Sequence, residues 1–205
     1  MSVDTPRLRM TGQERRLQLL DVGRTVFAER GYEAASVEEI AARAKITKPI
    51  VYEHFGGKEG LYAVVVDREV QALIDGITRS LVGDHPRTLL EQAAMAFLTY
   101  IEEEPEGFRI LVRDSPVASS AGTLASVIGD IAMQVEYIMQ NEFKSRGFDT
   151  KLSPLYSQAL VGMVALVGQW WLDAGKPKKE IVAAHLVNLA WNGLKGLETN
   201  PGLHD

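Results

Sequence analysis

The segment from Ser36 to Lys58, SVEEIAARAKITKPIVYEHFGGK, constrains the fold of this chain more than any other stretch. Ser36 and Glu39 have the spacing of a capping box, which predicts the start of a short helix. Thr47 stands at the start of a second short helix, with Pro49 in its first turn, where a missing N–H costs nothing. A Gly-Gly pair then breaks the chain before a third helix. Two short helices joined by a tight turn predict a helix-turn-helix.

The residues of this segment divide into an inward and an outward set. We expect the core of the helical unit to contain Ile40, Ala41, Ala44, Ile46, Val51 and Tyr52. The residues left to face outward are Thr47, Lys48, Pro49, Ile50 and His54. An exposed Pro49 and Ile50 suit thymine methyl groups in a major groove, while Thr47 and Lys48 can reach base edges or phosphates. Ser36 and Lys58 lie at helix starts, whose free N–H groups attract phosphate. An ordinary helical hairpin with a capped end is the alternative reading.

The rest of the chain also predicts helices. Thr11 and Glu14 form another capping box, and the helix that they start is expected to stop at Gly31. A long helix over 58–81 follows from the apolar stripe Tyr62, Val66, Val70, Leu73, Ile77 and Leu81. Further helices are predicted at 87–103, 105–113, 118–146, 153–174 and 178–196. No stretch alternates as a strand does, so we predict an all-α fold of about nine helices. A flexible arm at 1–9, carrying Arg7 and Arg9, precedes them.

Charge and composition exclude several classes of protein. Residues 1–60 hold ten Lys/Arg and nine Asp/Glu, whereas the remainder holds twelve and eighteen, so the basic side chains lie toward the front of an acidic chain. There is no cysteine, which excludes disulfides, thiolate metal sites and thiol nucleophiles. The N-terminus lacks the apolar region of a secretory signal. The apolar run Leu160 to Leu172 is shorter than the roughly 20 residues of a membrane span, so a buried helix, a cytoplasmic location and no membrane partner are expected.

The sequence contains no recognisable motif of an enzyme active site. The histidines His54, His85, His185 and His204 are scattered and form no HExxH or paired metal set. Gly56-Gly57-Lys58 lacks the rest of a nucleotide-binding loop. We therefore predict no catalytic residue, no metal and no cofactor. A helical adaptor without DNA binding is the second rival, separable from a DNA-binding protein by a salt-sensitive affinity for DNA.

The head of the chain resembles the N-terminal domain of the TetR family of bacterial one-component repressors. The string Tyr-x-His-Phe-x-x-Lys-x-x-Leu carries the resemblance, and the matching positions are Phe27, Gly31, Tyr32, Ser36, Ile40, Ala41, Ala44, Ile46, Tyr52, His54, Phe55, Lys58 and Leu61. It implies a DNA-binding domain over 1–57 and a ligand-binding, dimerising body over 58–205. It also implies DNA contacts at Ser36, Thr47, Lys48, Pro49, Tyr52, His54 and Lys58, with Tyr52 and His54 on phosphates.

Two positions depart from the family pattern. Lys45 occupies a turn position that is often Gly, so we expect a positive φ there and an added positive charge beside the DNA. Glu53 places a negative charge on the second short helix, which disfavours phosphate or accepts from a cytosine amino group. Together with Lys45 and Ile50, the seven matched residues make up the predicted DNA-binding set.

The body is expected to hold a dimer interface and an effector pocket. The helix at 153–174 is apolar nearly all round, and a two-fold bundle of this helix and 178–196 with their mates would bury both. The resemblance, together with the two-fold symmetry of operators, implies a homodimer through Leu160, Met163, Val167, Trp171, Leu186, Leu189, Ala190 and Leu194. A simple intrachain core is the alternative. The middle helices carry large flexible apolar residues, and for any single one of them core packing is the favoured reading. The resemblance implies that some of them line a pocket, with the candidates Met95, Phe97, Leu98, Ile101, Phe108, Leu111, Val112, Met133, Tyr137 and Trp170.

The resemblance implies a repressor that binds a palindromic operator and is released by a hydrophobic small molecule. The C-terminal third, LVGMVALVGQWWLDAGKP followed by LAWNGL, looks like actinobacterial regulators of lipid metabolism that respond to fatty acyl-CoA. A repressor of a drug-efflux gene with a xenobiotic ligand is the alternative.

Overall fold

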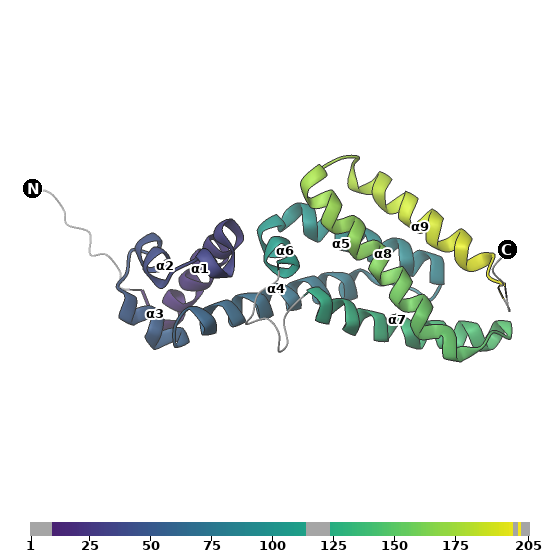
Figure 1. Cartoon of the computed structure of the whole chain (residues 1–205), viewed down its shortest axis with the longest axis horizontal. Helices are drawn as coiled ribbons and strands as arrows, with labels where there is room; N and C mark the ends of the chain where they lie inside the picture. The colour runs from purple at the N-terminus through teal and green to yellow at the C-terminus, as the bar shows by residue number, and fades with distance from the viewer. Residues whose placement is uncertain (1–9, 114–123, 199–200, 202–205) are drawn as a thin grey trace, which may run out of the picture.

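The computed structural model describes residues 10–113, 124–198 and 201, and within these ranges every regular element is a helix. The helices are α1 Gly12–Ala34, α2 Val37–Arg43, α3 Lys48–Phe55, α4 Lys58–Ser80, α5 Pro86–Glu103, α6 Pro105–Val112, α7 Leu124–Arg146, α8 Ser153–Ala174 and α9 Lys179–Lys195, with a 3-10 turn at Thr150–Leu152. The all-α prediction is confirmed. The chain is elongated, with α1 to α3 at one end, α5 and α7 to α9 at the other, and α4 running between them (Figure 1).

Local signals in the sequence set most helix boundaries. The Thr11–Glu14 capping box is present, and Gly31 leaves the helical region at φ 76°, as expected. The second predicted box is only half formed: Ser36 accepts from the Glu39 N–H at 3.1 Å, but the Glu39 carboxylate pairs with Arg43 instead of returning to the cap. An arginine four residues on attracts the carboxylate more strongly than a neutral N–H does. Residues 1–9, including Arg7 and Arg9, and the predicted start of α7 at 118–123 lie outside the described residues.

The helix α4 belongs to both ends of the molecule. Its stripe Tyr62, Val66, Val70 and Leu73 is buried as predicted, whereas Leu81, just beyond the helix, is exposed because α4 ends at Ser80. The first turns of α4 pack against α1 and α3, and its later turns pack against α5, α6 and α7. The body is completed by α9 against α5 and by α8 against α7.

The helix α8 is less buried than its composition predicts. With the preceding 3-10 turn it forms a 25-residue apolar helical segment, long enough by length and composition alone to cross a membrane. One face, which includes Ala165, Gly168 and Trp171, packs inside the chain. The opposite face exposes Leu166 and Trp170. The alternative of a simple intrachain core therefore does not account for the whole helix, because a single layer of neighbours covers only one side of a helix.

Candidate DNA-binding face and effector cavity

Contacts from α1 fix the positions of α2 and α3 in the head. The Arg16 guanidinium donates to the backbone carbonyl of His54 at 2.8 Å and lies 4.3 Å from the centre of the Phe55 ring. Gln18 donates to the carbonyl of Ala44 at the end of α2. Because Val51 is fully buried beneath them, α3 is held along one face and presents the other to solvent.

The exposed face of α3 carries the predicted outward residues. Thr47, Lys48 and Pro49 are exposed, and His54 is half-buried. Thr47 is the N-cap by position, but its hydroxyl makes no capping hydrogen bond, so it is available to a ligand. Side chains of this kind, on the second helix of a helix-turn-helix, are placed to meet a major groove.

Two assignments within α3 change in the structure. Tyr52, expected to contribute to the core of the head, is 54% exposed and lies with the outward residues. Ile50, expected to face outward, is half-buried and packs against the core. Ile50 and Tyr52 lie 100° to either side of the buried Val51, so a rotation of α3 that moves Ile50 toward the core moves Tyr52 toward solvent.

The turn between α2 and α3 and the start of α4 are also polar and partly charged. Lys45 is exposed and adopts φ 57°, the positive value that its place in the turn predicts. Lys48 forms an ion pair with Glu38, and this contact lowers the pKa of the Glu38 carboxyl. Glu53 is exposed on α3. The face therefore holds acidic groups that offset part of its positive charge.

Lys58 has partners within the protein. Its Nζ donates to the carbonyl of Tyr32 at 3.0 Å and lies 4.3 Å from the centre of the Tyr32 ring. These contacts fasten the start of α4 to the end of α1. Ser36, at the start of α2, is half-buried and caps that helix.

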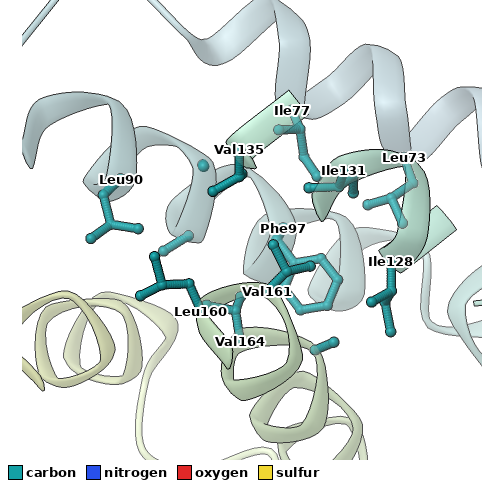
Figure 2. Close-up of a pocket in the computed structure, with 13 residues that line it drawn as sticks. Leu73, Ile77, Leu90, Phe97, Ile128, Ile131, Val135, Leu160, Val161 and Val164 are labelled. Carbon is teal, nitrogen blue, oxygen red and sulfur yellow. The ribbon is translucent and has the colours of Figure 1, made fainter. Parts of the chain in front are cut away.

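The body holds a partly open cavity of about 110 Å³ between α4, α5, α7 and α8. Its lining contains only apolar side chains: Leu73, Ile77, Leu90, Ala93, Ala94, Phe97, Ile128, Ile131, Val135, Leu160, Val161, Val164 and Ala165. Figure 2 shows the larger of these side chains converging on the space from the four helices. With no polar group in the lining, the cavity fits a ligand segment that makes no hydrogen bonds.

The cavity coincides with the predicted pocket at one residue, Phe97. The remaining predictions fall elsewhere: Leu98, Ile101, Phe108 and Leu111 are core, Val112 is half-buried against the core, Met95 lines separate surface hollows, and Met133, Tyr137 and Trp170 are exposed. Large flexible side chains were a poor guide, because the inward face of a helix is set by spacing. The Ile128, Ile131 and Val135 stripe on α7 carries the helical period that could have identified the lining.

The residues predicted for a dimer interface also separate into groups. Trp171, Leu186 and Ala190 are buried within the chain, and Trp171 Nε1 donates to the Pro177 carbonyl at 2.7 Å. Leu160 lines the cavity, Met163 and Val167 pack against the core, Leu194 lines a hollow between α7 and α9, and Leu189 is exposed. The exposed apolar side chains of α8 and α9 are Leu155, Leu166, Trp170, Ile181 and Leu189. These five residues are called the α8–α9 apolar face below.

Acidic and imidazole side chains do not gather into a candidate metal centre in the described residues: no group of three or more His, Cys, Asp or Glu is placed to hold an ion. The polar interactions at the head and the apolar cavity in the body are thus the two features on which a function can be built. A helix-turn-helix joined by one long helix to a cavity-bearing helical body defines a DNA-binding regulator.

Comparison with known proteins identifies the family. Residues 19–65 match the family model of the bacterial regulatory proteins of the tetR family. Residues 86–193, more than half of the chain, match a model of tetracyclin repressor-like C-terminal domains. The chain belongs to the TetR family of transcriptional regulators.

Individual relatives agree along nearly the whole chain. The HTH-type transcriptional activator FasR of Mycolicibacterium smegmatis is 32% identical over 192 residues, covering 91% of this chain and 85% of FasR. A TetR-like transcriptional regulator from Rhodococcus sp. RHA1 superposes with a TM-score of 0.77 at 26% identity, covering 92% of this chain and 100% of that structure. The fatty acid degradation regulator FadR from Bacillus halodurans has a TM-score of 0.72 at 19% identity, over 91% and 99% of the two chains, which shows a shared fold. These relatives are regulators rather than enzymes.

Proposed function

We propose that this protein binds a palindromic DNA operator as a homodimer and that an apolar small molecule, taken up by the body, lowers its affinity for that operator. The observation that carries the proposal is the connection of two sites by one helix. The α3 face lies at one end of α4, and Leu73 and Ile77 near the other end line the cavity. We propose that the functional boundary between the DNA-binding head and the sensing body lies between residues 57 and 58.

The α3 face supplies the DNA contacts in this proposal. Thr47, Lys48 and Tyr52 are exposed side chains that can reach base edges and phosphates, and Pro49 can meet a thymine methyl group. Lys45 adds charge from the turn, and the further proposed contacts are Ser36, Ile50, His54 and Lys58. Ile50 and Lys58 contribute less side-chain surface than the sequence suggested, because Ile50 packs inward and Lys58 is bound to Tyr32.

A homodimer would cover the α8–α9 apolar face. Soluble monomers rarely expose large contiguous apolar patches, and a two-fold axis would bring this face against its own copy. Two heads related by that axis would read two half-sites about one helical turn of DNA apart, or multiples of this distance. The dimer acts in the cytoplasm, where its DNA target lies.

The wholly apolar cavity lining favours a hydrocarbon segment in the effector. A volume of about 110 Å³ is smaller than the roughly 300–1,000 Å³ of typical ligand sites, so a larger effector must widen the cavity. A fatty acyl-CoA or another lipid would place its chain there. A planar xenobiotic, as in control of drug efflux, is the competing ligand class.

The sign of regulation depends on the position of the operator. An operator that overlaps the promoter makes a bound protein a repressor, which is the sign we propose. FasR is named an activator, so the sign needs its own test. Mapping the bound site relative to the transcription start distinguishes the two, since an activator site lies upstream of the region that the polymerase occupies.

Selection of bound fragments from the source genome tests the proposal. The wild-type protein should retain a palindromic fragment, with affinity that falls steeply with salt. Lys48→Ala combined with Tyr52→Phe should weaken binding without unfolding the chain. Decanoyl-CoA should then release the operator, with the xenobiotic crystal violet as the comparison ligand. A protein that retains no fragment at low salt would instead be a helical adaptor.

A further inference from the structure

One carboxylate lies buried where the head meets the body. Glu69, in the middle of α4, is 4% exposed. Its Oε1 lies 3.0 Å from Nε of Arg24 on α1, and its Oε2 accepts a hydrogen bond from the Tyr100 hydroxyl of α5 at 2.9 Å. Arg24 also forms an ion pair with Glu104 at the end of α5. These four residues, the Glu69 cluster, join the head to two helices of the body.

The helix α6 closes over the Glu69 cluster. A Cβ added at Gly107 would lie 2.7 Å from the Tyr100 hydroxyl and would overlap the Glu69 carboxylate. From the two ends of α6, Glu106 accepts from Thr25 at 3.3 Å and Arg113 donates to the Ala28 carbonyl at 2.7 Å. The head is therefore fastened to the body by directional polar contacts, which favour one relative angle.

Stability alone is a weak reason to keep a buried carboxylate in this place. Desolvation of buried charges offsets much of their attraction, and well-packed apolar residues often replace such pairs without loss. What an apolar contact does not supply is direction. The Glu69 carboxylate accepts a directional hydrogen bond from the Tyr100 phenol, and it attracts the Arg24 guanidinium as an ion pair without a hydrogen bond from Arg24 Nε.

The Glu69 cluster is adjacent to the cavity on two helices. Leu73 follows Glu69 by one turn of α4, and Phe97 precedes Tyr100 by three residues on α5; both line the cavity. Residues three or four apart lie on the same helix face, about 5–6 Å from each other. A ligand that pushes α4 and α5 apart at Leu73 and Phe97 would therefore also stretch the Tyr100–Glu69 hydrogen bond.

We propose that Glu69 is a positioning residue for the DNA-binding head. It holds α1 at one angle to the α4–α5 pair, and its hydrogen bond with Tyr100 is the contact that a filled cavity weakens. The inference rests on the proposed function, in which an effector controls operator affinity.

The discrimination between operators of different half-site spacing separates a positioning role from a stabilising one. Substitution of a residue that only stabilises the fold would not change this discrimination. One base pair inserted at the centre of the operator rotates one half-site by about 35° relative to the other. A dimer with fixed heads discriminates against that operator, whereas one with loosened heads tolerates it. The measured quantity is the ratio of the Kd for the lengthened operator to the Kd for the selected one.

Tyr100→Phe keeps the ring and removes the hydrogen bond. We expect it to lower the spacing ratio at least threefold, with a smaller change in the Kd for the selected operator. Glu69→Gln should act in the same direction, and if it does not fold, Tyr100→Phe decides the question. Tyr137→Phe makes the same chemical change at a side chain that is 70% exposed on α7, and it should leave the ratio unchanged.

Ala94→Phe fills the cavity without an added ligand and should lower the ratio as Tyr100→Phe does. The role of Glu69 is overturned if Tyr100→Phe has the same Kd ratio as the wild-type protein. It is also overturned if the wild-type protein itself binds both operators equally well. A wild-type ratio in Ala94→Phe overturns the link to the cavity. A wild-type protein that retains no operator removes the proposed function itself, and this inference falls with it.

Discussion

Gly168 on α8 lies directly against the ring of Phe97 on α5. A Cβ added at Gly168 would overlap the edge of that ring and would lie 2.8 Å from the terminal carbon of Ile101. The helices α5 and α8 thus approach each other through a missing side chain, and Phe97 is set where it forms one wall of the cavity. The shape of the cavity depends on this glycine.

Gly168→Ala should therefore destabilise the fold by about 1–3 kcal/mol, because Phe97 or α5 must move to admit the methyl group. Gly129→Ala on α7 is the matched control, since a Cβ there has no neighbour within 4 Å. The control should be neutral or about 0.5–1 kcal/mol more stable, as Ala replaces Gly within a helix. Urea unfolding of the three proteins measures the difference. Equal urea midpoints for the two variants would mean that Phe97 or α5 moves at little cost in stability to admit the methyl group.

Glu38→Gln should tighten DNA binding several-fold at low salt. The change removes a carboxylate that pairs with Lys48 and lies on the proposed DNA side of the head. Freed from Glu38, Lys48 can neutralise a phosphate, and the slope of log K against log salt should steepen by about one unit. Asp75→Asn, on the far half of α4, makes the same charge change away from the head and should have little effect. Fluorescence anisotropy titrations at several salt concentrations test this; equal slopes for the two variants contradict it.

If the chain forms the proposed homodimer, Leu166→Glu and Leu189→Glu should each convert it to a monomer at micromolar concentration. Both side chains belong to the α8–α9 apolar face, and a charge buried there at a two-fold interface would meet its own copy. Met133→Glu is the control, because Met133 on α7 is 62% exposed, close to the 65% of Leu166, but lies outside that face. Sedimentation velocity measures the mass. Operator affinity should fall as the dimer is lost, and a Leu166→Glu variant that remains dimeric would show that the interface lies elsewhere.

Tyr100 should make the fold sensitive to alkaline pH. Burial raises the pKa of the Tyr100 phenol well above its usual value, and the neighbouring Glu69 carboxylate raises it further. The unfolded chain releases this proton near pH 10, while the folded chain retains it. This contribution to stability is thus complete below about pH 10 and is lost as pH rises, by up to about 1.4 kcal/mol per pH unit.

Tyr100→Phe isolates the effect. At pH 8 the variant should be less stable by about 1–3 kcal/mol, because a buried acceptor on Glu69 loses its donor. The gap should narrow above pH 10, since the variant has no phenol to ionise at this position. Urea unfolding from pH 8 to 11.5 provides the curves. A difference in stability that stays constant across this range would show that the Tyr100 phenol has the same pKa in the folded and the unfolded chain.

The head was predictable because its signals are local. Thr11, Ser36 and the Gly56–Gly57 pair mark helix ends within a few residues of the groups that they cap or break, and the structure places the ends there. The positive φ of Lys45 followed from its place in the turn. Tyr52 and Ile50 were misassigned because α3 is only two turns long, and a small rotation about its axis exchanges exposed and buried positions.

The cavity was predicted poorly because its lining depends on how distant helices pack. Leu73 and Ile77 were recognised as one stripe of a long helix, but nothing local tells which turns of that stripe leave a space. Met133 and Tyr137 are large and flexible, yet they point outward because Ile131 and Val135 occupy the inner face of α7. On α8, the position of Gly168 in the core depends on a distant neighbour, since Phe97 precedes it by 71 residues in the chain.

The length of α4 gives it leverage. A helix of 23 residues is about 35 Å long, so a tilt of about 6° about one end displaces the other by about 3.5 Å. That displacement is roughly the rise of one base pair. A change in the body too small to alter any helix could therefore shift where a head stands on DNA by a whole step, and the protein can remain stiff throughout and still act as a switch.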